Sequence, residues 1–342
     1  MERKKILVTG GAGFIGGNFV QYMIKKYPQY DVYNLDLLTY AGDLVKHRDI
    51  EDNECYHFIK ADIADRGLMT ALFEKEKFDY VVHFAAESHV DRSITDPESF
   101  VRTNVIGTQV LLDMAKAHDV LKFVHISTDE VYGELDFDPT TFFTEETPLQ
   151  PNSPYSASKA SADLLVRAYH ETYGLSMNIT RCSNNYGPFH FPEKLIPLTI
   201  SRVLNDQKVP VYGDGKNIRD WLHVLDHCSA IDLIMHKGVS GEVYNIGGHN
   251  ERTNLEVVKT IIQALGKSED LIEFVEDRLG HDKRYAIDPT KLEQLGWKPK
   301  FNFDSGIAQT VQWYLDHKSW WKQIISGEYQ NYFEQQYSLK VK

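Results

Sequence analysis

The chain has 342 residues, and its 49 acidic and 37 basic side chains give a formal net charge of −12 at pH 7. At roughly 150 residues per domain, this length predicts about two domains. The apolar set AVILMFWYC makes up 42% of the residues, which is typical of a globular protein and excludes a disordered or collagen-like chain. The acidic balance argues against a nucleic-acid partner, because such binding depends on neutralising phosphates with basic side chains.

The sequence also indicates where the protein resides and which sites it lacks. It has no run of about 18 or more apolar residues, so we expect no membrane-spanning helix. The apolar stretch after the charged first residues breaks at Thr9-Gly10-Gly11, too early for a secretory signal. The three cysteines, Cys55, Cys182 and Cys228, include no CxxC pair, so we expect neither disulfides nor a cysteine zinc site. Together these features favour the cytoplasm, and no histidine pattern among the 14 histidines predicts a metal site.

The first half of the chain alternates between short apolar runs and longer amphipathic segments. We predict strands over 5–9, 31–36, 56–60, 79–85, 122–127 and 175–181, and helices over 14–27, 66–75, 100–117 and 154–173. Ser153 and Pro154 suit the start of the last helix, and Gly174 suits its end. Strands separated by helices of this length imply an α/β fold with a doubly wound, Rossmann-like parallel sheet.

The regular alternation of strand and helix patterns ends after Gly187-Pro188. Beyond this point prolines interrupt regular structure, and Gly213–Gly215 forms a turn. We therefore predict a first domain over 1–187, to which the chain returns near 217–247. A smaller, mixed α/β C-terminal lobe takes mainly 188–342.

A glycine pattern marks a nucleotide site. Gly10, Gly13 and Gly16 form GxxGxxG directly after the first strand and open a helix, whose free N–H groups favour a diphosphate. Asp36 lies 20 residues after Gly16, at the end of the second strand, where a carboxylate binds ribose hydroxyls. No arginine follows Asp36, so the pattern favours NAD over NADP. The alternative is a tight strand–helix turn without a ligand.

Other residues at the predicted strand ends belong to the same edge of the sheet. Asp62 and Ile63 follow the third strand, and Ala85 and Ala86 end the fourth. Ligands bind at this carboxyl edge in doubly wound sheets, and small residues let a cofactor lie close to the backbone. The alternative is ordinary packing of helix against sheet.

Tyr155 and Lys159 form a YxxxK pair on one face of the predicted 154–173 helix. A free tyrosine has a pKa of about 10 and is a poor base at neutral pH. A nearby ammonium stabilises the phenolate, so we expect Lys159 to lower the pKa of Tyr155 and to hold the nicotinamide ribose. The alternative is a solvated helix face.

With these motifs, the end of the fifth strand identifies a family resemblance. The glycine loop, YxxxK and Ser127–Gly133 resemble the extended short-chain dehydrogenase/reductase family. Within that family, Thr128-Asp129-Glu130, 86–93, 184–188 and 191–197 resemble the sugar-nucleotide 4,6-dehydratases. The resemblance runs from about residue 4 to beyond residue 315. In the related 4-epimerases, the positions of Asp129 and Glu130 hold non-acidic residues.

The resemblance implies a role for each catalytic residue. A hydride passes from the sugar C4 to NAD⁺ and later returns to C6. Tyr155 is then the C4 base, Glu130 the C5 base and Asp129 the acid that protonates the departing C6 hydroxyl. Thr128 hydrogen-bonds the C4 oxygen, and Lys159 tunes Tyr155. The alternative for the acidic pair is a favourable charge at a helix N-terminus.

The resemblance also implies two sets of binding residues. The set expected to contact NAD is Gly10, Gly13, Phe14, Ile15, Gly16, Asp36, Asp62, Ile63, Ala85, Ala86, Ser88, Thr103, Ser127, Tyr155, Lys159 and Asn185. The set expected to contact the nucleotide sugar is Ser88, Thr128, Asn184, Lys194, Leu195, Pro210, Tyr212, Arg219, Asn254, Arg278 and His281. The chain departs from the family at Gly17, where serine is usual, and at Leu279, where proline is usual.

The expected substrate is the small molecule dTDP-glucose, used in deoxysugar biosynthesis of the dTDP-rhamnose type. The expected assembly is a homodimer that pairs through helices 100–117 and 154–173. The preference for thymine rests on the resemblance alone. Another nucleotide-sugar 4,6-dehydratase and a 4-epimerase remain as alternatives, and a non-catalytic dinucleotide-binding regulator is a more distant one.

Overall fold

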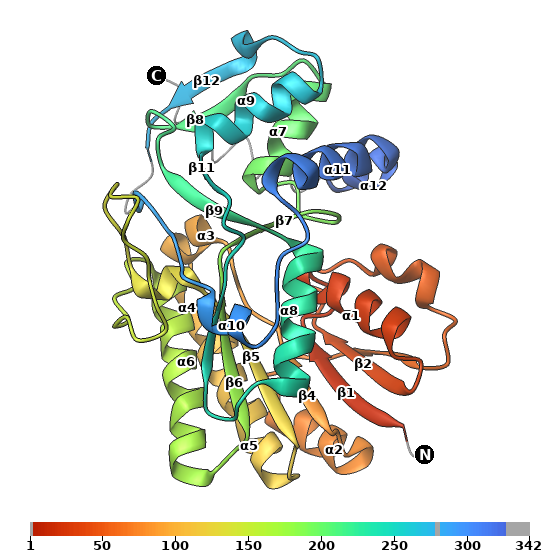
Figure 1. Cartoon of the computed structure of the whole chain (residues 1–342). Helices are drawn as coiled ribbons and strands as arrows, with labels where there is room; N and C mark the ends of the chain where they lie inside the picture. Colours follow the sequence, from red (N-terminus) through yellow and green to blue (C-terminus); the bar gives the residue numbers. More distant parts are fainter. Residues whose placement is uncertain (1–2, 278–280, 326–342) are drawn as a thin grey trace.

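The computed structural model describes residues 3–277 and 281–325 (Figure 1). A seven-stranded sheet has the order β10-β6-β5-β4-β1-β2-β3, and every neighbouring pair in it is parallel. Its strands are β1 Lys4–Thr9, β2 Tyr30–Asp36, β3 Tyr56–Lys60, β4 Tyr80–His83, β5 Lys122–Thr128, β6 Met177–Cys182 and β10 Val243–Ile246. The predicted fold class, a doubly wound parallel sheet, is confirmed.

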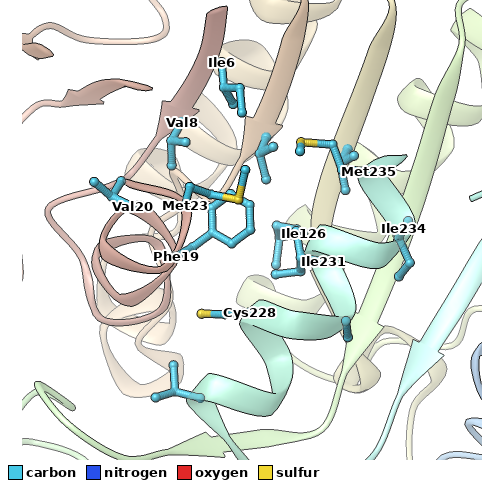
Figure 2. Close-up of a cluster of buried hydrophobic side chains, with 14 of the residues drawn as sticks. Ile6, Val8, Phe19, Val20, Met23, Ile126, Cys228, Ile231, Ile234 and Met235 are labelled. Atoms are coloured by element: carbon cyan, nitrogen blue, oxygen red, sulfur yellow. The ribbon is translucent and has the colours of Figure 1, made fainter. Parts of the chain in front are cut away.

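Helices cover both faces of this sheet. One face carries α1 Phe14–Lys26 and α8 Val224–Lys237, and the other carries α2 Arg66–Glu76, α5 Thr108–Ala117 and α6 Pro154–Tyr173. In β1, Ile6 and Val8 enter the first apolar cluster, whereas Leu7 enters the second. Figure 2 shows the first cluster, in which Phe19 of α1 and Ile231 of α8 meet the strands. Both faces of the sheet are therefore shielded from water, which explains why the strand sequences are nearly continuous apolar runs.

The return of the chain builds the edge of the sheet. After the β9 strand (Ile218–His223), α8 packs beside α1, and β10 then pairs with β6. The segment 217–247 thus supplies the edge strand β10 and the covering helix α8, although it lies far in sequence from the other strands of the sheet.

A smaller lobe lies above the carboxyl ends of the strands, drawn from green to blue in Figure 1. It contains the sheets β11-β9-β7 and β12-β8, in which β11 and β9 are antiparallel and the other pairs are parallel. Its strands are β7 Asn184–Tyr186, β8 Val209–Tyr212, β9, β11 Glu251–Thr253 and β12 Ile272–Val275. Its helices are α7 Leu195–Leu204, α9 Asn254–Ala264, α11 Phe303–Asp316 and α12 Lys318–Ile325.

Short elements complete the described chain and differ in places from the prediction. They are η1 Leu44–Ile50, α3 Val90–Thr95, α4 Pro97–Phe100, η2 Val101–Gly107, η3 Asp129–Tyr132, η4 Glu269–Leu271 and α10 Thr290–Gln294. The segment 100–117 was predicted as one helix, but η2 is a π-helix that precedes α5. Apolar spacing does not separate the two helix types over so few turns, and π-helices often occur at functional sites. Within the described residues, no helix is long and apolar enough to span a membrane.

Candidate active site

A cavity of about 390 Å³ lies between the carboxyl edge of the sheet and the smaller lobe. Every residue of the set predicted to contact NAD lines it. So does every predicted catalytic residue: Thr128, Asp129, Glu130, Tyr155 and Lys159. The cavity sits where β1 separates β2 from β4, which is the switch point at which doubly wound sheets bind ligands.

The glycine loop shapes one end of the cavity. Gly10 has a φ of +71°, and a Cβ there would lie 2.6 Å from the backbone nitrogen of Ala85, so only glycine lets the loop approach β4 this closely. The N-cap of α1 is Gly13, which makes no side-chain capping bond, and the first turn of α1 has no acidic residue. The first N–H groups of α1 are thus suited to an anionic group.

Asp36 is held at the end of β2 by the backbone. Its Oδ2 accepts the N–H of Ala12 at 2.9 Å, and its Oδ1 accepts the N–H of Leu38 at 2.8 Å. These bonds fix the carboxylate beside the glycine loop while leaving lone pairs for further donors. The arrangement fits a dinucleotide whose diphosphate lies on α1 and whose ribose lies on β2.

The acidic pair lies where β5 ends and η3 begins. The Thr128 hydroxyl accepts the backbone N–H of Glu130 at 3.3 Å and lies 3.3 Å from Oδ1 of Asp129. The Asp129 side chain is buried, and its Oδ2 has no hydrogen-bond partner among the residues that the structure describes. An unpartnered carboxyl oxygen in a cavity wall is available to a ligand.

Burial raises the pKa of Asp129 well above its ordinary value, and the adjacent Glu130 carboxylate raises it further. Arg219 and the Thr128 hydrogen bond act in the opposite direction, but they do not reverse it. Asp129 therefore keeps a proton at a pH where an ordinary aspartate has lost its own. A carboxyl group with a raised pKa beside a second carboxyl group is an arrangement suited to paired acid and base catalysis.

The Tyr155 phenol is buried in the cavity wall. Burial raises the pKa of Tyr155 well above its ordinary value, and the Glu130 charge raises it further, whereas a hydrogen bond with Thr128 lowers it. Lys159 is not among the groups with the largest effect on this pKa, so the expected lowering by Lys159 stays a prediction. The Lys159 ammonium instead donates to the carbonyl of Ile126 at 2.7 Å, and burial lowers its pKa to about 8.

Asn185 and Thr103 are positioned by their neighbours. The Asn185 amide oxygen lies 2.9 Å from Nδ1 of the buried His227, and its nitrogen donates to the Ser183 carbonyl at 3.0 Å. Thr103 lies in the π-helix η2, next to Asn104, whose amide nitrogen donates to the Ser158 hydroxyl at 2.8 Å. The π-helix is thereby tied to α6, the helix that carries Tyr155.

The predicted substrate set divides into two groups. Ser88, Thr128, Asn184, Lys194 and Leu195 line the cavity, whereas Pro210, Tyr212, Arg219, Asn254 and His281 are not in its wall. Arg278, like the departure Leu279, lies outside the described residues.

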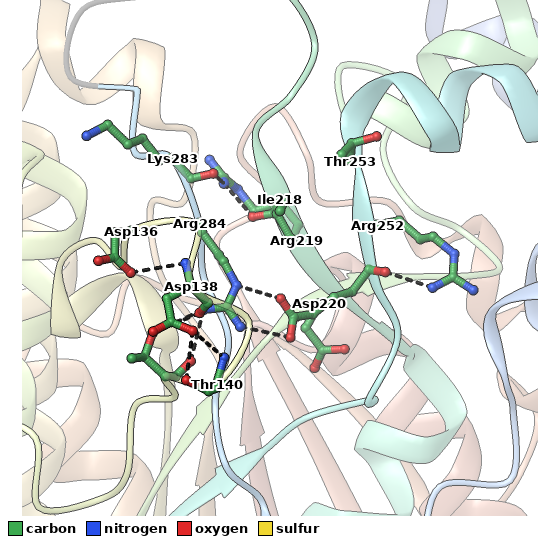
Figure 3. Close-up of polar contacts among 12 residues, drawn as sticks. Asp136, Asp138, Thr140, Ile218, Arg219, Asp220, Arg252, Thr253, Lys283 and Arg284 are labelled. Atoms are coloured by element: carbon green, nitrogen blue, oxygen red, sulfur yellow. Dashed lines mark hydrogen bonds and ion pairs between the residues drawn. The ribbon is translucent and has the colours of Figure 1, made fainter.

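The outer group gathers in the smaller lobe. The rings of Tyr212 and His281 are in edge contact at 6.0 Å. Figure 3 shows Arg219 among the polar contacts of β9. Its guanidinium is buried, donates to the Asp282 carbonyl at 2.9 Å and lies over the Tyr285 ring at 4.2 Å. Because Arg219 also acts on the pKa of Asp129, it lies near the acidic pair.

Some wall residues were not assigned from the sequence. They include Tyr40, Lys46, Glu87, Phe191, Glu193 and Trp320. Glu87, Phe191 and Glu193 lie in the stretches 86–93 and 191–197, so the resemblance itself was a usable signal. Trp320 had none: it reaches the cavity from α12, where its Nε1 donates to Asp43 at 2.7 Å.

Within residues 3–277 and 281–325, no group of three or more histidine, cysteine or acidic side chains is arranged to hold a metal ion.

The chain is similar to known proteins over most of its length. The profile of the family described as "GDP-mannose 4,6 dehydratase" matches residues 7–310. The chain is 52% identical to dTDP-glucose 4,6-dehydratase of Xanthomonas campestris pv. campestris strain B100, over 94% of this chain and 96% of that one.

Solved structures are similar in the same way. One is dTDP-glucose 4,6-dehydratase from Bacillus anthracis in complex with NAD, with 52% identity, a TM-score of 0.88 and coverage of 94% and 99% of the two chains. Another is dTDP-glucose 4,6-dehydratase from Streptomyces venezuelae with NAD and TYD bound, with 47% identity, a TM-score of 0.90 and the same coverage.

The raised pKa of Asp129 has a consequence for stability. The folded state binds a proton at Asp129 that the unfolded state has lost, so this group makes the folded state less stable as pH rises above the ordinary aspartate pKa of about 3.9. We expect Asp129→Asn, which cannot ionise, to raise the melting temperature relative to the unsubstituted protein at pH 8 and by less at pH 5. Differential scanning calorimetry at both pH values measures this. An equal difference at both would contradict a protonated Asp129.

Proposed function

The chain belongs to the GDP-mannose 4,6-dehydratase family, and from this premise we propose that it is an NAD-dependent dehydratase that converts dTDP-glucose to dTDP-4-keto-6-deoxyglucose. The observation that carries the proposal is the pair formed in one cavity wall by Glu130 and the buried Asp129, whose pKa is raised well above its ordinary value. Elimination of water needs a base at C5 and an acid at C6.

NAD, when bound, accepts the hydride from C4 and returns it to C6, so that it is regenerated in each turnover. The glycine loop and the N-terminus of α1 hold its diphosphate, and Asp36 holds a ribose. Lys159 of α6, whose ammonium donates to the Ile126 carbonyl of β5, places a positive charge beside the nicotinamide ribose. Asn185, fixed by His227, faces the nicotinamide side.

Three side chains move the protons. Tyr155 takes the proton of the C4 hydroxyl, which requires the positive charges of Lys159 and of bound NAD⁺ to offset the burial that raises its pKa. Thr128, which is hydrogen-bonded to Tyr155, binds the C4 oxygen. The ketone at C4 acidifies the C5 proton, which passes to the Glu130 carboxylate. Asp129 gives its proton to the C6 hydroxyl as the C6–O bond breaks, so one water molecule leaves and a C5–C6 double bond forms. Hydride return to C6 and protonation at C5 complete the product.

The alternatives fit the site less well. A 4-epimerase has no step for a second acid–base pair, and a dinucleotide-binding regulator has no use for Tyr155 and Lys159 beside that pair. Other nucleotide sugars can undergo the same reaction at C4, C5 and C6, so the acid–base groups alone do not separate them from dTDP-glucose. The relatives at about half identity, which carry the name dTDP-glucose 4,6-dehydratase, support thymidine diphosphate.

We also propose that the protein is a homodimer and that it resides in the cytoplasm. Large apolar side chains are exposed on adjoining helices: Val101 and Ile106 on η2, at 49% and 48%, and Leu164 on α6, at 58%. These are the helices through which the sequence predicts pairing, and a second copy of the chain would cover this face.

The three cysteines are free and buried, which supports a reducing compartment such as the cytoplasm.

Incubation with dTDP-glucose tests the reaction directly. We expect the loss of one water molecule by mass spectrometry, a 4-keto-6-deoxy product and no net accumulation of NADH. Glu130→Gln and Asp129→Asn should each lower kcat by about 10²- to 10⁴-fold, because each removes one proton-transfer group. Both variants should still copurify with NAD, since neither side chain forms the diphosphate or ribose site. Unchanged turnover in either variant would contradict its role, as would formation of a 4-epimer without water loss.

The homodimer is tested by charge on the exposed apolar face. We expect Leu164→Asp to convert a dimer to a monomer in sedimentation equilibrium, because a carboxylate on this face would be buried without a partner. Phe274→Asp is the control, because Phe274 is 53% exposed on β12 of the smaller lobe, an element outside the expected interface. A monomeric unsubstituted protein, or a dimer that tolerates Leu164→Asp, would refute this interface.

A further inference from the structure

We propose that Lys46 is a positioning residue for the NAD diphosphate. Its ammonium hydrogen-bonds two carbonyls of the glycine loop, and its stem occupies space that Gly17 leaves open. The inference rests on the proposed NAD site and adds to it a residue outside the glycine pattern.

The contacts of Lys46 are directed at the loop. Lys46 belongs to η1, and its Nζ donates to the carbonyl of Ala12 at 2.7 Å and to that of Gly13 at 2.8 Å. The side chain is 3% exposed and lines the cavity. The Gly13 carbonyl belongs to the peptide that carries the N–H of Phe14, the first residue of α1. An ammonium bonded to this carbonyl polarises the peptide, which makes the N–H a stronger donor to an anion.

Gly17 provides the space for the lysine stem. A Cβ at Gly17 would lie 2.4 Å from Cδ of Lys46 and 3.2 Å from the Gly11 carbonyl. The crowded atom is in the middle of the lysine chain rather than at its flexible end, so any side chain at residue 17 would displace the ammonium. The glycine at residue 17, where the family usually has serine, therefore makes room for the lysine at residue 46.

The helix that carries Lys46 is itself anchored. The Asp43 side chain accepts the Val45 N–H at 2.8 Å and caps η1, and its backbone N–H donates to the Ala12 carbonyl at 2.9 Å. The second Asp43 oxygen accepts Nε1 of Trp320 at 2.7 Å. The lysine is thus held between the glycine loop and a helix of the smaller lobe, and it is not a mobile surface side chain.

The charge balance around Lys46 favours an added anion. Two carbonyls, and not a carboxylate, bind the ammonium. Burial lowers its pKa to about 8, while Asp43 on its own helix and Asp36 at the end of β2 raise it. The adjacent His47 is neutral, since burial lowers its pKa to about 4. A buried ammonium is costly without a counter-charge, and a diphosphate on the cavity side of the loop offsets that cost.

The test measures release of NAD from the holoenzyme. Labelled NAD is loaded, excess unlabelled NAD is added, and the loss of label is followed. We expect Lys46→Met, which keeps the stem and removes the charge, to release NAD about tenfold faster or more at pH 7. Release from the unsubstituted enzyme should accelerate between pH 7 and pH 9.5, as Lys46 loses its proton. Release from Lys46→Met should accelerate less over this range, because, of Lys46 and Lys159, only Lys159, whose pKa is also about 8, is left to lose its proton.

A second variant leaves Lys46 in place. Gly17→Ala should also speed release, because it displaces the ammonium, but it should have little effect in a Lys46→Ala background, where the crowded atom is gone. Equal release rates for Lys46→Met and the unsubstituted enzyme, the same pH profile in both, or additive effects of the Gly17 and Lys46 substitutions would overturn the proposal. A protein that binds no NAD in any form would instead overturn the proposed function itself.

Discussion

The site depends on the electrostatic conflict between two neighbouring carboxyl groups at the end of β5. Asp129 and Glu130 follow each other in the chain, and the first is buried while the second is only partly so. Two like charges this close oppose each other's ionisation. Burial decides which one keeps its proton, and the pKa of Asp129 is the one driven upward. Two residues that are adjacent in the sequence thus supply both an acid and a base to the same cavity.

The scaffold makes this arrangement possible. β5 lies in the middle of a dry parallel sheet, so its carboxyl end is rigid, and η3 begins there with Thr128 as its cap. The cap bonds both acidic residues and also acts on Tyr155. The smaller lobe closes over this edge, so the water that would equalise the two carboxyl groups is largely excluded from Asp129.

Much of this followed from sequence, for identifiable reasons. The parallel sheet was predictable because apolar runs and amphipathic helices alternate, and the walls around Gly10, Asp36 and Ala85 were predictable because strand ends meet at one edge. The limits of α6 followed from Ser153 and Gly174, which cap it as expected. These features depend on local residue chemistry and on the general rules of one fold class.

What sequence did not predict depends on tertiary burial. The raised pKa of Tyr155 results from desolvation and the Glu130 charge, neither of which spacing reveals. The π-helix η2 has the same apolar spacing as an ordinary helix. The bracing of the glycine loop by Lys46 joins residues 34 positions apart, and no motif marks it. Arg219 sits behind the acidic pair, outside the cavity wall, because β9 and Tyr285 enclose it.

In the proposed reaction, one hexose reacts with a hydride acceptor, a base and a protonated acid held in one cavity. Incubation of the enzyme with dTDP-glucose that carries deuterium at C4 shows whether the hydride leaves and returns within one molecule. We expect a 4-keto-6-deoxy product with the deuterium at C6 of the same molecule, read by NMR and mass spectrometry. Deuterium retained at C4, lost to solvent or found in released NADH would contradict it.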